Sequence, residues 1–231
     1  MKIKAVLMDF CGTLAVDVGA SSNLPKAIAN ALNVRGFKVN EGDVVNALRS
    51  ALDILPVGLD YSDVAKVALT LRKLDIDPTP SLVEYIYRVF DEALIASTKL
   101  EDDALDLLTW LRSHGIKTGI LSNHGSYDAV TGFLKKHGIL ELFDIIVVSH
   151  HIGWKKPSKQ IFNYALTLLR VNPENCVHVG DDVLADVFGA KKAGIKAIWK
   201  ANQLSDVKPW IAPDAIITKL SQLKALIEQW R

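Results

Sequence analysis

Cysteine is scarce in this sequence, which has only Cys11 and Cys176 among its 231 residues. Two cysteines cannot build the disulfide framework that stabilises many secreted proteins. Both lie in segments that are predicted to form strands, so we expect two free thiols. A reducing, cytoplasmic setting fits this composition best.

An excess of charge of one sign is also lacking, because 27 lysine and arginine residues face 26 aspartate and glutamate residues and the formal net charge is +1. Without a strong overall field, nucleic acids and anionic membranes are not expected as partners. No apolar run approaches the roughly 20 residues of a membrane-spanning helix. The N-terminal residues have no long apolar region or cleavage site typical of a secretory leader. These absences favour a cytoplasmic protein whose charged residues act locally.

Short β-rich runs alternate with helical patterns over most of the chain. The runs lie at residues 3–9, 116–122, 144–149, 176–180, 195–199 and 214–218, and helical patterns lie at 101–114, 127–136, 159–170 and 184–192. Alternation of strands and helices predicts a parallel sheet with helices on its faces. The expected fold class is therefore α/β.

Residues 15–98 interrupt this alternation. Four helical patterns follow one another there, at 25–35, 42–54, 62–74 and 81–97, with no convincing strand between them. The prediction is a core domain made of residues 1–14 and 99–231, with an all-helical domain inserted at 15–98. A chain of 231 residues is long enough for one domain plus such an insertion.

Polar residues follow four of the predicted strands. They are Asp9 after the first, Ser122 and Asn123 after the second, Lys156 in the loop after the third, and Asp181 and Asp182 after the fourth. The carboxyl ends of parallel strands meet at one edge of the sheet, which is the usual ligand site of an open α/β fold. A nucleophilic carboxylate, a hydroxyl, an ammonium and an acidic pair together suit a phosphoryl group and a divalent cation.

These four segments resemble the motifs of the haloacid dehalogenase-like hydrolase superfamily. The family's Asp-x-Asp-Gly-Thr is similar to Asp9-Phe10-Cys11-Gly12-Thr13, and its later motifs are similar to Ile120-Leu121-Ser122-Asn123, to Gly153-Trp154-Lys155-Lys156-Pro157 and to Val179-Gly180-Asp181-Asp182. The motifs cover residues 1–14 and about 100–200, and the helical insert resembles the cap of the superfamily's first subclass. The resemblance implies a Rossmann-like core, a helical cap and, as for most members, phosphatase activity.

The resemblance also implies a role for each matching residue. Asp9 would attack phosphorus and form an aspartyl phosphate, and Lys156 would neutralise charge on the transferring group. Ser122 would donate a hydrogen bond to a phosphoryl oxygen. Thr13 and Asn123 are expected beside it in the substrate site.

Magnesium is the cofactor that the resemblance implies. The adjacent carboxylates of Asp181 and Asp182 would repel each other unless a cation offset their charge, and Mg²⁺ prefers oxygen ligands. The expected ligands are Asp9, the backbone carbonyl of Cys11, and Asp181 together with Asp182 or without it. For Asp186 two hypotheses stay open, a further ligand or a neighbour of the ligands.

Cys11 stands where phosphatases of the superfamily have the aspartate that protonates the leaving oxygen and then activates water. The acid and base role therefore passes to a thiol, whose ordinary pKa is about 8.5. General acid–base catalysis contributes about 10² to 10⁴ in rate, so we expect a slow phosphatase or one that prefers good leaving groups. A thiol near Mg²⁺ and Lys156 is also a hypothesis for redox control.

Two other functions stay open. Dehalogenases of the superfamily resemble Asp-x-Tyr at the first motif and need no metal, whereas the pair of Asp181 and Asp182 favours a metal and phosphate chemistry. A weakened relative that only binds a phosphorylated ligand or a partner is supported by Cys11 alone. Residues 15–98 contain no motif that identifies a substrate. The expectation is a small phosphorylated metabolite, with a monomer and a homodimer both open.

Overall fold

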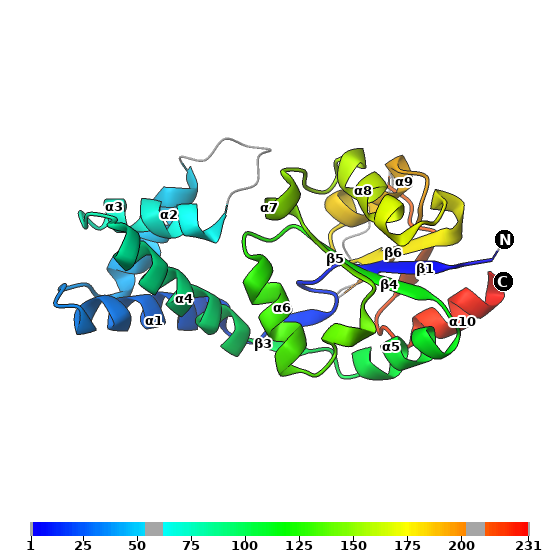
Figure 1. The fold of residues 1–231 in the computed structure, drawn as a ribbon, viewed down its shortest axis with the longest axis horizontal. Coiled ribbons are helices and arrows are strands. Elements are labelled where there is room, and N and C mark those ends of the chain that lie inside the picture. Colours follow the sequence, from blue (N-terminus) through cyan, green and yellow to red (C-terminus); the bar gives the residue numbers. More distant parts are fainter. Residues whose placement is uncertain (1, 54–61, 202–210, 231) are drawn as a thin grey trace.

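The computed structural model describes residues 2–53, 62–201 and 211–230. Figure 1 shows a sheet covered by helices and, to one side of it, a separate group of helices formed by α1 to α4. Among the described helices, none is long and apolar enough to cross a membrane.

Six parallel strands form the central sheet. They are β1 (Ala5–Met8), β4 (Lys117–Ser122), β5 (Ile145–Val148), β6 (Cys176–Gly180), β7 (Lys196–Lys200) and β8 (Ala215–Ile217), in the spatial order β5-β4-β1-β6-β7-β8. All four residues of β1 are buried, since β4 and β6 flank it and helices cover both faces. Strands buried on both faces are continuous apolar runs, and the predicted α/β class with a parallel sheet is confirmed.

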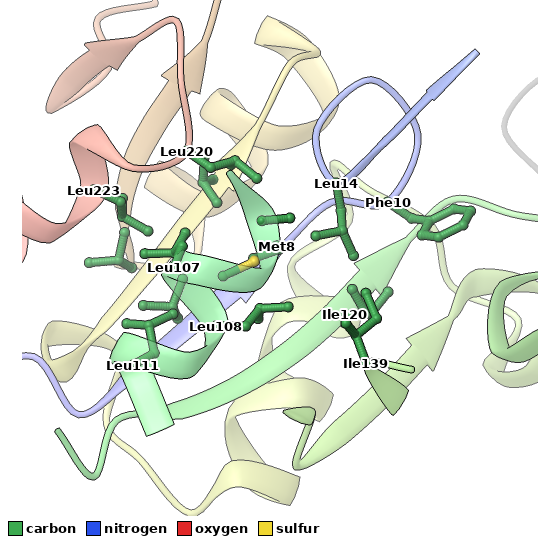
Figure 2. Packing of buried hydrophobic residues seen from close by; sticks show 14 of the residues in the cluster. Met8, Phe10, Leu14, Leu107, Leu108, Leu111, Ile120, Ile139, Leu220 and Leu223 are labelled. Atoms are coloured by element: carbon green, nitrogen blue, oxygen red, sulfur yellow. The ribbon is translucent and has the colours of Figure 1, made fainter. Parts of the chain in front are cut away.

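Helices cover both faces of this sheet. On one face lie α5 (Ala104–Ser113), α6 (Tyr127–Lys136) and α10 (Gln222–Gln229), and on the other lie α8 (Lys159–Leu169) and α9 (Gly189–Lys192), as Figure 1 shows. Met8 enters the first apolar core, beside Leu107 and Leu108 (Figure 2), while Leu7 enters the second with Phe162. Successive side chains of β1 therefore fill two different cores, as the two-residue period of a strand requires.

The segment predicted as one helix at 184–192 is divided in two. Val183–Phe188 forms a π-helix, and α9 begins directly after it at Gly189. A widened helical turn of this kind often occurs at functional sites. Here it contains Asp186, which becomes important below.

The inserted segment forms the separate helical group. Its helices α1 (Ala20–Val34), α2 (Glu41–Asp53), α3 (Asp63–Lys73) and α4 (Pro80–Ala96) overlap the four predicted patterns. They pack around an apolar core of their own, which includes Ile28, Leu71 and Ile86. Ile54, the last residue of one predicted pattern, lies outside the described residues.

The expectation of no strand within residues 15–98 is wrong. β2 (Ala15–Asp17) pairs antiparallel with β3 (Thr98–Leu100), with Ala15 opposite Leu100. Each of these strands is three residues long, too short to show an alternating pattern, and their pairing joins segments that are far apart in the sequence. This ribbon lies across the predicted domain boundaries, and the division at 14/15 and 98/99 stays a prediction.

Candidate active site

Asp9 lies at the carboxyl end of the central strand β1. Its backbone N–H donates to the carbonyl of Val179 at 2.9 Å, and the residue is only 7% exposed. The chain then turns through Gly12 at a φ of +78°, where a Cβ would lie 2.2 Å from Oδ2 of Asp181. Glycine is required at this position for both reasons, and its small size lets the carboxylate of Asp181 approach the turn after Asp9.

The ammonium of Lys156 joins two carboxylates of the site. Its Nζ donates to Oδ1 of Asp9 at 2.5 Å and to Oδ1 of Asp186 at 2.6 Å. Burial alone would lower the pKa of Lys156, but its contacts with Asp186 and Asp9 outweigh burial and raise that pKa above the usual value. Lys156 therefore carries a fixed positive charge between the two aspartates.

Asn123 and Thr13, both predicted to bind substrate, hold other residues of the site in place. The Asn123 side chain accepts the backbone N–H of Lys156 at 2.8 Å and donates to its carbonyl at 2.9 Å. Thr13 Oγ1 donates to Oδ1 of Asp181 at 3.4 Å. Ser122 is buried at the end of β4, directly before Asn123.

The carboxylates of Asp9, Asp181 and Asp186 form one acidic cluster, in which an oxygen atom of each lies within 4.8 Å of the others. Burial raises the pKa of Asp9 to about 7, with Lys156 opposing and Asp186 adding to the shift. Burial and the charge of Asp186 also raise the pKa of Asp181. One ammonium does not offset three carboxylates, two of them buried and that of Asp181 partly buried, and a divalent cation fits this set of oxygen atoms.

Asp186 has more hydrogen-bond partners than the other two carboxylates. Besides Lys156, its Oδ1 contacts Nε2 of His178 at 2.8 Å, and its Oδ2 accepts the N–H of Asp182 at 3.1 Å. Burial would raise the pKa of Asp186, but Lys156 and His178 hold it below the usual value. Burial lowers the pKa of His178, so that the neutral ring donates from Nε2. Sequence reasoning missed His178, although a lone histidine inside the apolar strand β6 is a detectable signal.

Asp182 lies outside the acidic cluster. Its Oδ1 accepts the N–H groups of Leu184 and Ala185, each at 2.8 Å, and thereby caps the π-helix. Asp182 is exposed, whereas Asp181 is partly buried. The third carboxylate beside Asp9 and Asp181 is Asp186, for which the sequence left the role of a further ligand open. Asp182 as a metal ligand stays a prediction.

Cys11 retains exposed surface beside the acidic cluster, and both cysteines are free thiols. Desolvation by the surrounding protein raises the pKa of the Cys11 thiol to about 12, and the charge of Asp9 adds to the shift. This direction is opposite to the lowered pKa that redox control of a thiol requires. The structure gives that hypothesis no support.

Strand β7 fixes the turn after Asp9 and the loop of Asp181. Trp199 Nε1 donates to the carbonyl of Asp181 at 2.9 Å. Lys200 is buried, donates to the carbonyl of Gly12 at 3.1 Å and lies 2.5 Å from a carboxylate oxygen of Glu101. Sequence reasoning missed both residues, although a lysine at the carboxyl end of a buried strand was a visible signal.

Helix α3 contacts the loop that follows Asn123. The N–H of Asp63 donates to the carbonyl of Gly125 at 2.9 Å, and Lys66 Nζ lies 2.6 Å from Asp63 Oδ1. A Cβ on Gly125 would lie 2.2 Å from the same Asp63 oxygen. The absence of a side chain at Gly125 therefore allows the cap to approach the core here.

Helix α4 contacts the same loop through Ser126. The Ser126 hydroxyl donates to Oδ2 of Asp91 at 2.8 Å, accepts the N–H of Ala129 at 3.0 Å and lies 3.0 Å from the Tyr87 hydroxyl. Burial raises the pKa of Asp91 to about 6, although Ser126 and Tyr87 oppose the shift. We call the contacts of Asp63, Lys66, Tyr87 and Asp91 with residues 124–126 the cap junction.

The fold and the site together define a hydrolase with a Rossmann-like core, a helical cap and an acidic cluster at the carboxyl ends of its strands. The chain belongs to the haloacid dehalogenase-like hydrolase family, whose family model matches residues 3–194.

Two relatives with named activities and one solved structure are similar to this chain over nearly its whole length. A phosphoserine phosphatase of Thermus thermophilus is 31% identical over 248 residues, which cover 96% of this chain and 98% of the relative. A glyceraldehyde 3-phosphate phosphatase of Pyrococcus furiosus is 25% identical over 237 residues, which cover 99% of this chain and 94% of the relative. The structure of a 2-haloacid dehalogenase from Pseudomonas syringae has a TM-score of 0.81 at 23% identity, with 99% of this chain and 100% of that chain covered. At this identity, the last match shows the fold alone.

Proposed function

We propose that this protein is a Mg²⁺-dependent phosphatase that acts on a small phosphorylated compound through an aspartyl phosphate on Asp9. The observation that carries the proposal is the acidic cluster with Lys156 between Asp9 and Asp186, at the carboxyl edge of the sheet. The phosphatase names of the relatives from T. thermophilus and P. furiosus support the same class of reaction.

The donor set of the acidic cluster fits Mg²⁺. Asp9, Asp181 and Asp186, with the backbone carbonyl of Cys11, would hold the ion. The raised pKa values of Asp9 and Asp181 support this assignment, because burial and the charge of Asp186 disfavour the ionised carboxylates more than Lys156 favours them. When bound, the ion would supply Lewis-acid stabilisation of the negative charge on the phosphoryl group.

The protein's own side chains perform the transfer. A carboxylate oxygen of Asp9 attacks phosphorus, and the bond from phosphorus to the leaving oxygen breaks with its electron pair on that oxygen. Lys156 offsets negative charge on the phosphoryl group. The side chain of Asn123 positions Lys156 through hydrogen bonds to its backbone. Ser122 donates to a phosphoryl oxygen. Water then attacks the phosphorus of the aspartyl phosphate, which releases inorganic phosphate and restores Asp9.

Cys11 makes the proton transfer to the leaving oxygen weak. A thiol with a pKa of about 12 is a poor acid at neutral pH, so the leaving oxygen departs with little help. Proton transfer by a well-placed acid contributes about 10² to 10⁴ in rate. We therefore expect slow turnover of alkyl phosphates and faster turnover of esters with acidic leaving groups.

The cap limits the size of the substrate. Residues 15–98, proposed as the cap domain, contact the loop after Asn123 through the cap junction. A helical cap held over the site excludes bulk water and large substrates. A small phosphorylated molecule is therefore proposed rather than a folded phosphoprotein.

The test is hydrolysis of an activated aryl phosphate and of an alkyl phosphate, each with and without Mg²⁺, by the wild type and by Cys11→Asp. We expect Mg²⁺-dependent release of phosphate that rises by about 10² in Cys11→Asp with an alkyl phosphate. Metal-independent halide release from a 2-haloacid would instead establish the dehalogenase function. No reaction in either form would favour a protein that only binds its ligand.

A further inference from the structure

An apolar cavity of about 220 Å³ lies beside the turn that follows Asp9. Its walls come from that turn, from both ends of the cap segment and from α6, and include Phe10, Cys11, Ala20, Ile95, Ala129 and Phe133. Phe10 and Phe133 pack edge to face, with ring centroids 5.1 Å apart. Phe10, Ala129 and Phe133 are buried, so this side of the cavity has fixed walls.

The carboxylate at the rim of this cavity already has partners. Asp17 Oδ1 accepts the N–H groups of Gly19 at 2.8 Å and Ala20 at 2.7 Å, where α1 begins. It therefore stabilises the start of the helix.

Two further polar residues line the cavity, and both have partners. The Thr98 hydroxyl donates to the carbonyl of Leu94, and His124 Nδ1 accepts the N–H of Ser126. The other lining residues are aliphatic or aromatic apart from Cys11, and such surface favours an apolar group.

Cys11 connects the cavity with the reacting atoms. It lines the cavity, and it stands two residues after Asp9 in the chain. A phosphoryl group attacked by Asp9 would therefore have this cavity next to it. An ester group that extends past Cys11 would enter the cavity.

We propose that this cavity holds the leaving group of the substrate, and that the preferred substrates are phosphate monoesters of phenol-sized aromatic alcohols. The inference rests on the proposed phosphatase function and specifies its substrate class. An apolar cavity of about 150 Å³ in another protein takes up benzene, so about 220 Å³ accommodates one ring with a small substituent.

The side chain at position 11 supports the same class of substrate. Cys11, two residues after Asp9, lines the cavity, so no carboxylic acid stands at this position to protonate the leaving oxygen. When Asp9 attacks phosphorus, the bond from phosphorus to the aryl oxygen breaks and its electron pair stays on the aryloxide. An aryloxide is stable enough to leave in this form and takes its proton from water afterwards, whereas an alkoxide is not.

The test compares phenyl phosphate with glycerol 3-phosphate in the wild type, Ala20→Leu and Ala27→Leu. Ala20 and Ala27 are both half-buried in α1, but only Ala20 lines the cavity. One methylene in an apolar pocket changes kcat/KM by about 10- to 200-fold. We expect the wild type to prefer phenyl phosphate by at least about 10-fold. Ala20→Leu should lose about 10-fold with phenyl phosphate only, and Ala27→Leu should behave as the wild type.

Phenylphosphonate and methylphosphonate test binding in the cavity without any influence of the acidity of the leaving group. In both compounds a phosphorus–carbon bond replaces the ester bond, so attack by Asp9 releases no leaving oxygen. With Mg²⁺ present, phenylphosphonate should raise the Tm of the wild type and Ala27→Leu more than methylphosphonate does, and this difference should vanish in Ala20→Leu. If Ala20→Leu fails to fold, Ile95→Ala provides the second variant. By enlarging the cavity, it should shift the preference from phenyl toward naphthyl phosphate.

Two results would overturn the inference in distinguishable ways. If the wild type hydrolyses glycerol 3-phosphate as well as phenyl phosphate, or if Ala20→Leu lowers both equally, the cavity does not select the substrate while the phosphatase function stands. If no phosphate ester is hydrolysed by the wild type, the proposed function fails and the substrate class fails with it.

Discussion

Two groups of aspartates, the acidic cluster and the cap junction, each contain a buried carboxylate with a raised pKa. Asp9 in the first and Asp91 in the second are each 7% exposed, and burial raises the pKa of both. Their partners differ. Asp9 faces an ammonium and two further carboxylates, whereas Asp91 faces the hydroxyl group of Ser126.

This difference shows that the partners of a buried aspartate, rather than its burial, indicate its role. Asp9 shares one lysine with competing carboxylates and keeps lone pairs for a cation or an electrophile. Asp91 accepts a hydrogen bond from the residue that also caps α6, so it fixes the position of a helix. We therefore assign chemistry to the acidic cluster and alignment of the cap to the junction.

The largest expected effect is the difference in kcat between two Asp→Asn variants, one in the acidic cluster and one in the cap junction. Asp9→Asn removes the proposed nucleophile and should lower kcat by about 10⁴ or more, as loss of a nucleophile does elsewhere. Asp91→Asn, matched in exposure and in chemistry, should stay within about 10-fold of the wild type. Initial rates with an aryl phosphate measure both, and circular dichroism checks the fold. Equal losses in the two variants would refute the assignment of roles.

A smaller loss is expected when the lysine of the acidic cluster is removed. Lys156→Met leaves Asp9 and Asp186 without their ammonium, so kcat should fall by about 10² to 10³. The free energy of unfolding should fall by about 3–5 kcal/mol, since a buried ion pair loses one partner. Urea unfolding and steady-state kinetics measure these two quantities.

Lys155→Met is the control for the lysine substitution, because Lys155 is only half-buried and precedes Lys156. Its rate and unfolding midpoint should remain close to those of the wild type. A large loss of rate in Lys155→Met and none in Lys156→Met would reverse the assignment of the lysine.

The next effect concerns which carboxylates hold the metal. Asp186→Ala should raise the Kd for Mg²⁺ by about 10- to 100-fold, a size typical when a group that supports a metal site is lost. Asp182→Ala should leave this Kd unchanged and lower the free energy of unfolding by about 1 kcal/mol, since it removes a helix cap. Isothermal calorimetry with Mg²⁺ separates the two. An increased Kd in Asp182→Ala alone would favour the predicted ligand set that includes Asp182.

The smallest expected effect is a dependence of stability on pH at the cap junction. The pKa of Asp91 is raised from 3.8 to about 6 in the folded protein, so the folded state binds more protons than the unfolded state between these values. The contribution of Asp91 to stability is therefore fully present below pH 3.8 and is lost as the pH rises through about 6. Urea unfolding at several pH values should show this slope in the wild type and a weaker one in Asp91→Asn.

The parallel sheet was predictable because buried strands are continuous apolar runs, such as Ala5–Met8, and need no knowledge of their partners. The β2–β3 ribbon was not predictable. Its three-residue strands form only because they pair with each other, and about 80 residues of the inserted segment separate them in the sequence. Strand ends also predicted that Asp9 and Lys156 would lie together, and the structure places Lys156 Nζ 2.5 Å from Asp9.

The finer arrangement of the site depends on local geometry that no sequence pattern expresses. The sequence left open whether Asp182 joins Asp181 as a ligand. In the structure Asp182 caps the π-helix, and the widened turn brings Asp186 beside β6. Gly180 allows this, since a Cβ there would lie 2.1 Å from the Asp186 carboxyl carbon. In the same way, the amide of Asn123 is bound to the backbone of Lys156, a contact between distant segments.

The buried ammonium of Lys200 has a mechanical consequence. It contacts the carbonyl of Gly12, just before the chain enters β2, and the carboxylate of Glu101, just after the chain leaves β3. Both covalent connections between cap and core are thus anchored at one point, and the N–H of Glu101 also donates to the carbonyl of Leu14. One side chain therefore holds the turn that follows Asp9 together with the segment that leaves β3, so the position of the Asp9 turn and the two ends of the inserted segment depend on a single buried charge.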